Sequence, residues 1–244
     1  MATSNYFRHF PSMDYDIKND GNLVRAKDLF RQIRVFDDSD DGATGYEYLH
    51  IDNGERPDTL SARVYGDSTL YWLFWLVNDE LTTHADWPRS NQLQEKYIDR
   101  KYAGKALVAE YSTSIVQSST SKFLMGEKVH GATSGALGYA IKVDPTFNHV
   151  IVNDVKGVFQ VGETIEGIKS GKSFTLHALA DYKDRPHHYI DANGNKTTQY
   201  NATYDIQTNA EYERKLNDDK RFIKYIPAKF SNRIFQEFRE VIRT

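Results

Sequence analysis

The sequence contains no cysteine among its 244 residues. This absence excludes disulfide bonds and zinc sites built from thiolates, and it suits a protein made in a reducing cytoplasm. No apolar run approaches the roughly 20 residues that a membrane-spanning helix requires. The longest such run covers only residues 70–77. Residues 1–10 also lack the apolar core of a signal peptide. We therefore expect no membrane partner.

The sequence has no large excess of charge of either sign, since its net charge is −3 and its isoelectric point is about 6.2. Without a basic field, no nucleic-acid partner is expected. Aromatic residues are abundant instead, with 16 Tyr and 13 Phe. Such residues are enriched at contact surfaces, because they bury a large ring and Tyr keeps a polar group as well. The composition therefore favours a protein that binds other proteins.

One motif occurs twice. Each shared residue of the first copy, residues 123–135, returns 36 positions later in the second copy, residues 159–171. A fixed period indicates two copies of one supersecondary unit. Alternating apolar positions and glycines at turns are typical of β structure. The sequence thus predicts a self-paired β module, entered through a Ser/Thr-rich linker at residues 111–122. The shared elements are a phenylalanine, a Gly-Glu pair, an aliphatic residue, a glycine and a Ser-Gly pair.

The clearest helix signals surround a Tyr-Gly break. Pro57 opens a helix that Gly66 ends in the C-cap position. Asp67 or Ser68 then caps a second helix over residues 69–77, which is apolar around nearly its whole circumference and should be buried. Elsewhere the pattern predicts helices over residues 22–33, 91–102, 210–219 and 234–242, strands over 46–51, 150–152 and 222–226, and turns at 144–148 and 191–195.

Several local patterns suggest a ligand site, and each has a plainer interpretation. Residues 167–173 resemble a phosphate-binding loop, but three residues separate the glycines where four are required, and a strand follows. Residues 37–42 match half of a calcium loop, but Tyr48 stands where a bidentate glutamate is needed, which favours a solvated turn. The adjacent His187 and His188 should point to opposite faces of a strand. No serine elbow or cysteine nucleophile is present. The sequence therefore predicts no catalytic, cofactor-binding or metal-binding residue.

The tryptophans allow two interpretations. Trp72, Trp75 and Trp87 could line a groove for a sugar or a peptide. Trp72 and Trp75, however, lie in the apolar helix, so a place in the core is favoured for both. Trp87 precedes Pro88 in a loop and is expected at the surface.

Residues 54–78 resemble LysM modules, which contain a strand, a helix, a Tyr-Gly break, a second helix ending in Asn and a returning strand. Together with flanking motifs, they resemble the baseplate wedge protein that carries a LysM-like domain in T-even-type contractile-tailed phages. The resemblance covers about residues 1–104 and 182–244, and the β insert makes the chain similar to a cyanophage-like member. The flanking motifs are Tyr6-Phe-Arg-His-Phe-Pro11, Ala85-Asp-Trp-Pro88, Tyr212-Glu-x-x-Leu-Asn217 and Lys220-Arg-x-Ile-Lys224.

The resemblance and the patterns together predict an α+β protein in four consecutive segments. These are an N-terminal arm and helix (1–45), a LysM-like βααβ module (46–104), an inserted all-β module with the two-copy repeat (105–181), and a C-terminal α+β segment ending in an amphipathic helix (182–244).

The resemblance implies a non-enzymatic structural subunit of the virion tail baseplate, with no cofactor and no small-molecule ligand. Its expected partners are other wedge proteins, adjacent wedges, and the first sheath layer or hub. The alternatives are a LysM-type module of a tail-associated lysin, which would bind peptidoglycan or chitin, and a hydrolase with a dispersed site. Partner contacts are expected at the arm, the module loops and the last helix, through Tyr6, Phe7, Phe10, Arg56, Asp58, Asp67, Trp87, Phe235 and Phe238.

Overall fold

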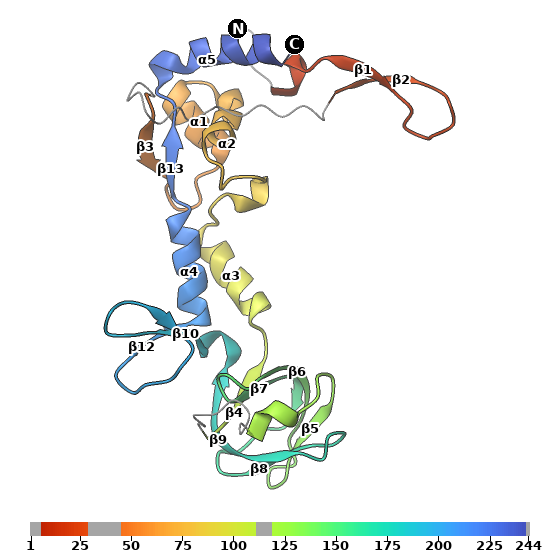
Figure 1. The fold of residues 1–244 in the computed structure, drawn as a ribbon, viewed down its shortest axis with the longest axis vertical. Helices are drawn as coiled ribbons and strands as arrows, with labels where there is room; N and C mark the ends of the chain where they lie inside the picture. Colours follow the sequence, from red (N-terminus) through yellow and green to blue (C-terminus); the bar gives the residue numbers. More distant parts are fainter. Residues whose placement is uncertain (1–5, 29–44, 111–118, 243–244) are drawn as a thin grey trace. The chain divides into compact units, whose positions relative to one another are not determined.

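The computed structural model describes residues 6–28, 45–110 and 119–242 (Figure 1). The chain forms two compact units. Unit 1 comprises residues 1–91 and 217–244, and unit 2 comprises residues 92–216. Helices and strands are mixed, so the α+β class is confirmed. Both the N-terminal and the C-terminal part of the chain contribute to unit 1. The half calcium loop at 37–42 and most of the Ser/Thr-rich linker lie outside the described residues.

Unit 1 contains a two-stranded sheet whose strands are far apart in the sequence. β3 (Glu47–His50) pairs with β13 (Phe222–Tyr225) in antiparallel fashion. α1 (Pro57–Tyr65) follows β3 and ends at Gly66, whose φ of 72° is the left-handed conformation that glycine adopts without strain. This helix and its C-cap are therefore confirmed. The second predicted helix is divided into η2 (Ser68–Leu70) and α2 (Trp72–Val77).

After α2, the side chain of Asn78 binds β13 at the place where the LysM-like pattern predicts a returning strand. Its side-chain amide donates to the carbonyl of Lys224 (2.8 Å), and its side-chain oxygen accepts from the amide of Lys224 (2.9 Å). The Asn78 side chain thus forms with Lys224 of β13 the two hydrogen bonds that the backbone of a neighbouring strand would form. The amide of Leu81 then donates to the carbonyl of Asn78 in a turn (3.0 Å). The strand that pairs with β3 comes instead from the C-terminal part of the chain.

The N-terminal part of unit 1 forms an antiparallel ribbon. β1 (Ser12–Tyr15) pairs with β2 (Val24–Lys27), with Met13 opposite Ala26 and Tyr15 opposite Val24. The helix expected over residues 22–33 is therefore wrong for residues 24–27, where cross-strand pairing overrides the local helical pattern. Residues 29–33 lie outside the part of the chain that the structure describes.

The core of unit 1 is closed by the C-terminal helix. α5 (Ala228–Val241) begins after Pro227, earlier than the predicted residue 234, and buries Phe238 on its apolar side. Ile242, which caps its C-terminal end, is also buried, whereas Val241 is 55% exposed. Two further short helices are η1 (Tyr6–His9) and η3 (His84–Asp86). The largest fully buried side chains among the described residues of unit 1 are Ile51, Leu60, Leu73, Phe74, Ile226 and Ile242.

Unit 2 contains a closed barrel of six antiparallel strands in the order β4-β7-β6-β5-β8-β9 (Figure 1). Closure pairs every strand on both sides, which leaves the barrel without edge strands. Leu107, Val129, Val150, Ile165 and Leu176 form its core, each with no exposed surface. The strands are β4 (Lys105–Ala109), β5 (Lys128–Gly131), β6 (Leu137–Asp144), β7 (His149–Lys156), β8 (Thr164–Gly167) and β9 (Ser173–Asp181), with η5 (Ser119–Lys122) before β5.

The rest of unit 2 is a helix pair with a small sheet. Ile98 and Tyr102 pack against Ala210, so the pair buries an apolar seam. Leu93, on the same helix as Ile98, lies outside this seam and is 56% exposed. The elements are α3 (Asn91–Lys101), α4 (Asn209–Asp219), η6 (Tyr182–Asp184), and a sheet in the order β11 (Lys196–Thr197), β10 (Pro186–Ile190), β12 (Asp205–Thr208).

Candidate interaction surfaces

The aromatic N-terminal arm packs against its own chain. The ring of Tyr6 lies 4.9 Å from that of Phe10, 5.2 Å from that of Trp72 and 5.1 Å from that of Phe238, between centroids. Phe10 is 2% exposed and Phe238 is 3% exposed. The arm and the last helix, at both of which partner contacts were expected, therefore meet in one internal cluster. Phe10 and Phe238 serve the core of unit 1.

The rim of this cluster is more open. Phe7 is 52% exposed, although its ring lies 5.0 Å from that of Tyr6. Phe235 is half-buried, and its ring packs edge-to-face with that of His9, with the ring centroids 5.2 Å apart. Beside Phe7 lies a cleft of about 590 Å³. Its aromatic lining includes Tyr6, Phe7, Tyr71, Trp72, Trp75 and His84.

Two charged residues at the start of α1 form an exposed pair. The Arg56 guanidinium donates two parallel hydrogen bonds to the Asp58 carboxylate, each 3.1 Å long. Their side chains are 77% and 43% exposed. Asp67 plays a different part, because its carboxylate caps η2 by accepting from the amide of Thr69 (2.8 Å). The predicted cap is thus confirmed. Of these three candidate residues, Arg56 and Asp58 expose their charged groups, whereas the Asp67 carboxylate is bound within the chain.

Trp87 is buried, with 9% of its surface exposed, although its loop position suggested a surface residue. Its indole N–H donates to the carbonyl of Glu55 (2.8 Å), and its ring stacks on that of Trp75 at 5.3 Å. The neighbouring Asp86 closes a capping box with Thr83. Hydrogen bonds from the backbone amide of Thr83 and from the hydroxyls of Thr82 and Thr83 lower the pKa of Asp86 to about 2. The Ala-Asp-Trp-Pro motif therefore anchors its own loop.

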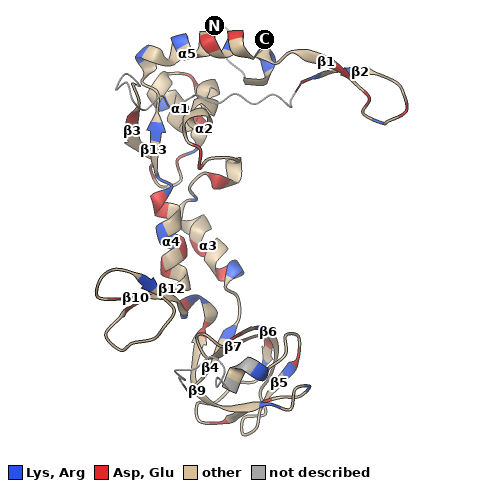
Figure 2. Cartoon of the chain, in the orientation of Figure 1, with Lys and Arg blue, Asp and Glu red and all other residues tan. Residues whose placement is uncertain are grey.

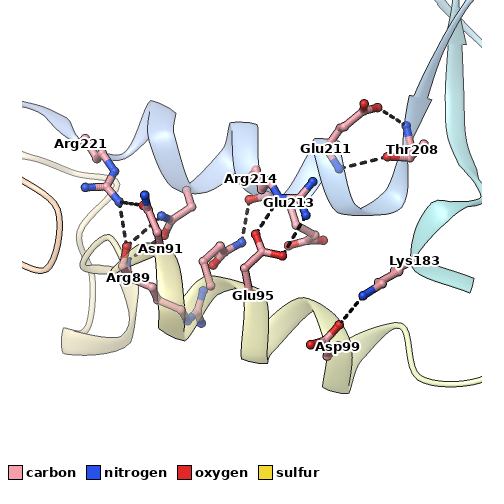
Figure 3. A network of polar contacts seen from close by, with 12 residues as sticks. Arg89, Asn91, Glu95, Asp99, Lys183, Thr208, Glu211, Glu213, Arg214 and Arg221 are labelled. Carbon is pink, nitrogen blue, oxygen red and sulfur yellow. Dashed lines mark hydrogen bonds and ion pairs between the residues drawn. The ribbon is translucent and has the colours of Figure 1, made fainter. Parts of the chain in front are cut away.

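The motifs near the end of the chain form a buried polar network in unit 1 (Figure 3). The side-chain oxygen of Asn217 accepts from the amide of Arg89 (2.8 Å), and its amide donates to the Arg89 carbonyl (3.0 Å). The Arg221 guanidinium, 5% exposed, donates to that same carbonyl (3.0 Å), to Asn91 (3.0 Å) and to Asp218 (3.2 Å). A buried arginine needs several acceptors, and these motif residues supply them. These motifs were recognisable in the sequence, but their role in holding their own chain together was not.

A second network joins α3 and α4 within unit 2 (Figure 3). The Glu213 carboxylate accepts from the Lys101 ammonium (2.7 Å) and from the Tyr102 hydroxyl (2.9 Å). Glu95 and Arg214 form a bidentate pair with hydrogen bonds of 2.7 and 2.8 Å. Such forked pairs fix geometry as well as charge. The network therefore holds the two helices in register.

In the barrel, two buried glutamates connect the copies of the repeat. Glu163 accepts from the amides of Thr133 (3.1 Å) and Ser134 (2.8 Å) and from the Ser134 hydroxyl (2.8 Å). Glu127 receives the equivalent bonds from the amide and hydroxyl of Ser170, at 2.9 and 3.0 Å. Each glutamate thus binds the Ser-Gly turn of the other copy. The two copies are related by a pseudo-two-fold exchange that their sequence similarity alone did not reveal.

The glycines of the motif make room for these carboxylates. A Cβ added to Gly131 would lie 2.6 Å from Glu163, and one added to Gly167 would lie 2.8 Å from Glu127. Burial alone would raise the pKa of both carboxyls. The hydrogen bonds from backbone amides and serine hydroxyls outweigh it, so the pKa of Glu127 and that of Glu163 lie below the ordinary value. Both glutamates are therefore ionised structural groups.

The turn that resembles a phosphate loop belongs to this arrangement. The amides of Lys169 (3.2 Å) and Ser170 (2.9 Å) do point at an anion, but that anion is the carboxylate of Glu127. β9 follows the turn, as the sequence predicted. The chain thus uses the anion-binding geometry of a turn for its own side chain.

The two adjacent histidines correct one further expectation. The Nδ1 atoms of His187 and His188 lie 2.9 Å apart, although neighbours in a regular strand point to opposite faces. A shift of register between Pro186 and His188 in β10 brings them together. Within the described ranges no group of three or more His, Cys, Asp or Glu residues could hold a metal ion. In those same ranges no helix is both long and apolar enough to traverse a bilayer.

Comparison with known proteins gives one family. Residues 6–111 match the model of a family described as base plate wedge protein 53. No curated protein matches the chain. The matched residues contain the aromatic arm, the ribbon, β3, α1, α2 and α3 of the structure, together with β4, the first strand of the barrel.

Proposed function

This chain is a baseplate wedge protein of the phage tail, and we propose that it is a non-enzymatic structural subunit that binds neighbouring wedge proteins and helps to join wedges around the hub. Its place is the tail baseplate of the virion. The proposal assigns the protein's exposed apolar and charged groups to contacts with other subunits, near the first sheath layer or the hub.

The observation that carries this proposal is the exposed apolar surface of the β1–β2 ribbon. Val24 and Tyr15, opposite each other in the strands, are 50% and 45% exposed, and Ile17 and Leu23 in the connection between the strands are 63% and 68% exposed. Directly opposed residues share a face, so Met13, Tyr15, Val24 and Ala26 form one apolar side. An isolated two-stranded ribbon is only marginally stable in water. Contact with a neighbouring subunit would cover this side and stabilise the ribbon. The opposite side carries Ser12, Asp14, Arg25 and Lys27.

Co-expression with candidate wedge proteins, followed by sizing, tests the proposal. A stable hetero-complex is expected, and Val24→Asp should weaken it at least about tenfold, because a charge would enter an apolar contact. Arg25→Gln, on the polar side of the same ribbon, should change the affinity by less than about twofold. If the chain elutes alone with every wedge protein, the proposed function is wrong.

We further propose that Arg56 and Asp58 face a partner. Exchanging the two residues, Arg56→Asp with Asp58→Arg, keeps an opposite-charge pair but swaps the positions of the positive and the negative charge. The exchange is expected to weaken wedge binding about tenfold, while the melting temperature falls by no more than a few degrees, since exposed pairs contribute about 0–1 kcal/mol. Binding is read by sizing and isothermal titration, and folding by circular dichroism. Unchanged assembly would remove these two residues from the interface.

A second candidate function, glycan binding by the LysM-like module, rests on the aromatic cleft beside Phe7. Trp75 stacks with His84 at 4.9 Å along its wall, and aromatic faces are common platforms for sugars. Titration with chitin oligosaccharides, followed by tryptophan fluorescence, distinguishes the two candidates. Saturable binding that Trp75→Ala abolishes would favour the glycan function.

A further inference from the structure

The pseudo-two-fold exchange in the barrel creates two equivalent backbone faces. We call the one around Glu127 the Glu127 face, made by residues 122–128 and 167–172. Its counterpart, the Glu163 face, is made by residues 158–164 and 131–136. Equivalent backbone bonds have nearly equal lengths: Gly126 N to Ala140 O and Gly162 N to Leu176 O are both 2.7 Å. Where a position is exposed on both faces, a difference between the two residues is therefore not required by this shared backbone. The exception is Ala136, which is buried in the barrel core whereas its equivalent, Lys172, is exposed.

Both faces expose apolar side chains. On the Glu127 face Leu124 is 43% exposed, Met125 74% and Ile168 61%. These residues lie together, because the amides of Leu124 and Lys169 both donate to the Glu127 carboxylate (2.6 and 3.2 Å). The equivalent residues of the Glu163 face are Gln160, Val161 and Ala132, with Val158 exposed beside them.

The two faces differ in charge, because one is rich in lysine and the other carries no basic residue. The Glu127 face carries four exposed lysines, and its only carboxylate, Glu127, is buried and bound by the turn. Blue segments mark basic residues on the short helix before β5 and on the loops beside β5 (Figure 2). No basic residue occurs at any of the equivalent positions of the Glu163 face. The pairs are Lys122 and Val158, Lys128 and Thr164, Lys169 and Thr133, and Lys172 and Ala136.

We propose that the Glu127 face is a docking surface for an acidic, apolar patch on another baseplate protein. This inference rests on the proposed structural role and adds the chemistry of one contact. Exposed Leu124, Met125 and Ile168 provide the apolar centre, and the lysines provide a basic rim that attracts carboxylates and rejects basic partners. Met is suited to such a surface because its flexible chain adapts to the opposing shape.

The pseudo-symmetry supplies a matched control for the test. Lys128→Glu with Lys169→Glu reverses the charge of the Glu127 face, and Thr164→Glu with Thr133→Glu places the same charges at equivalent positions of the Glu163 face. All four positions are exposed, so both variants should fold, which thermal melting checks. The full chain carrying each pair is supplied to phage lacking their own copy, and its content in purified baseplates is measured by mass spectrometry.

The first pair is expected to lower incorporation at least about tenfold, and the second less than about twofold. A photo-crosslinking amino acid at Met125 should link to a peptide of another baseplate protein that is rich in Asp and Glu, whereas one at Val161 should not. Equal effects of the two pairs, or a link to a basic peptide, to lipid, to nucleic acid or to a second copy of this chain, would overturn the docking surface. Normal incorporation of both pairs would overturn it too, yet leave the proposed function intact, whereas absence of the unaltered chain from baseplates would refute the function itself.

Discussion

Replacement of Phe238 by alanine is expected to lower the free energy of unfolding of the purified protein by about 3–5 kcal/mol. The side chain is 3% exposed and lies 4.5 Å from Trp72 and 5.1 Å from Tyr6, between ring centroids. Its removal would leave a cavity where the N-terminal arm, α2 and α5 meet. Urea denaturation followed by tryptophan fluorescence measures the loss, since Trp72 reports on this cluster.

Phe7→Ala provides the control for this prediction. Phe7 belongs to the same arm but is 52% exposed, so its replacement should cost less than about 1 kcal/mol. The comparison also decides what Phe238 does. If Phe238→Ala leaves the unfolding curve unchanged and abolishes wedge binding, then the residue faces a partner, and its burial within the chain does not describe its role.

Replacement of Glu127 by glutamine is expected to destabilise the barrel by about 2–4 kcal/mol, because hydrogen bonds to a buried charged group are lost. The carboxylate accepts from the amides of Leu124 and Ser170 and from the Ser170 hydroxyl. The amide group of glutamine has one acceptor oxygen and would direct its own donors at these amides. Chemical denaturation followed by circular dichroism measures the effect. Glu166→Gln, at an exposed position of β8, should be neutral.

The same carboxylates make the barrel sensitive to acid. The folded-state pKa of Glu127 and of Glu163 lies below the ordinary value of 4.5. Their stabilising contribution is therefore fully present above that ordinary value and is lost as the pH falls through the folded-state pKa. Thermal melts of the unaltered protein between pH 7 and pH 3 should show the loss, and Glu127→Gln with Glu163→Gln should flatten it. An equal pH dependence in both proteins would assign acid sensitivity to other groups.

Local signals predicted the helices and several strands of the chain, although they missed β1, β4 and the sheet of β10, β11 and β12. Pro57 and Gly66 bound α1, Asp67 caps η2, and Pro227 separates β13 from α5, because each of these residues restricts its own backbone or binds one nearby. The 36-residue repeat likewise predicted β structure. Local patterns failed at β2, where pairing with β1 replaces an expected helix, and at His187 and His188, where a register shift brings the rings together.

The candidate site was predictable only in part. Aromatic composition indicated contact surfaces, but burial divides these residues: Phe7 is exposed, while Phe10, Trp87 and Phe238 belong to the core. Burial depends on what lies opposite a side chain in space, and no local pattern records that. The lysines of the Glu127 face could be read from the sequence, yet only the exchange of the two repeat copies shows that they gather on one face.

The sequence by itself determined the turns, the helix caps, the repeat and the family of residues 6–111, because these depend on residues close together along the chain. Only the tertiary structure decided that β3 pairs with β13, that Asn78 binds β13 in place of a strand, and that Glu127 and Glu163 each hold the other copy's turn. These contacts join residues between 29 positions apart, as in Glu163 and Ser134, and 178 positions apart, as in Glu47 and Tyr225. Their formation depends on the packing of the whole chain, because many alternative partners satisfy the same local pattern.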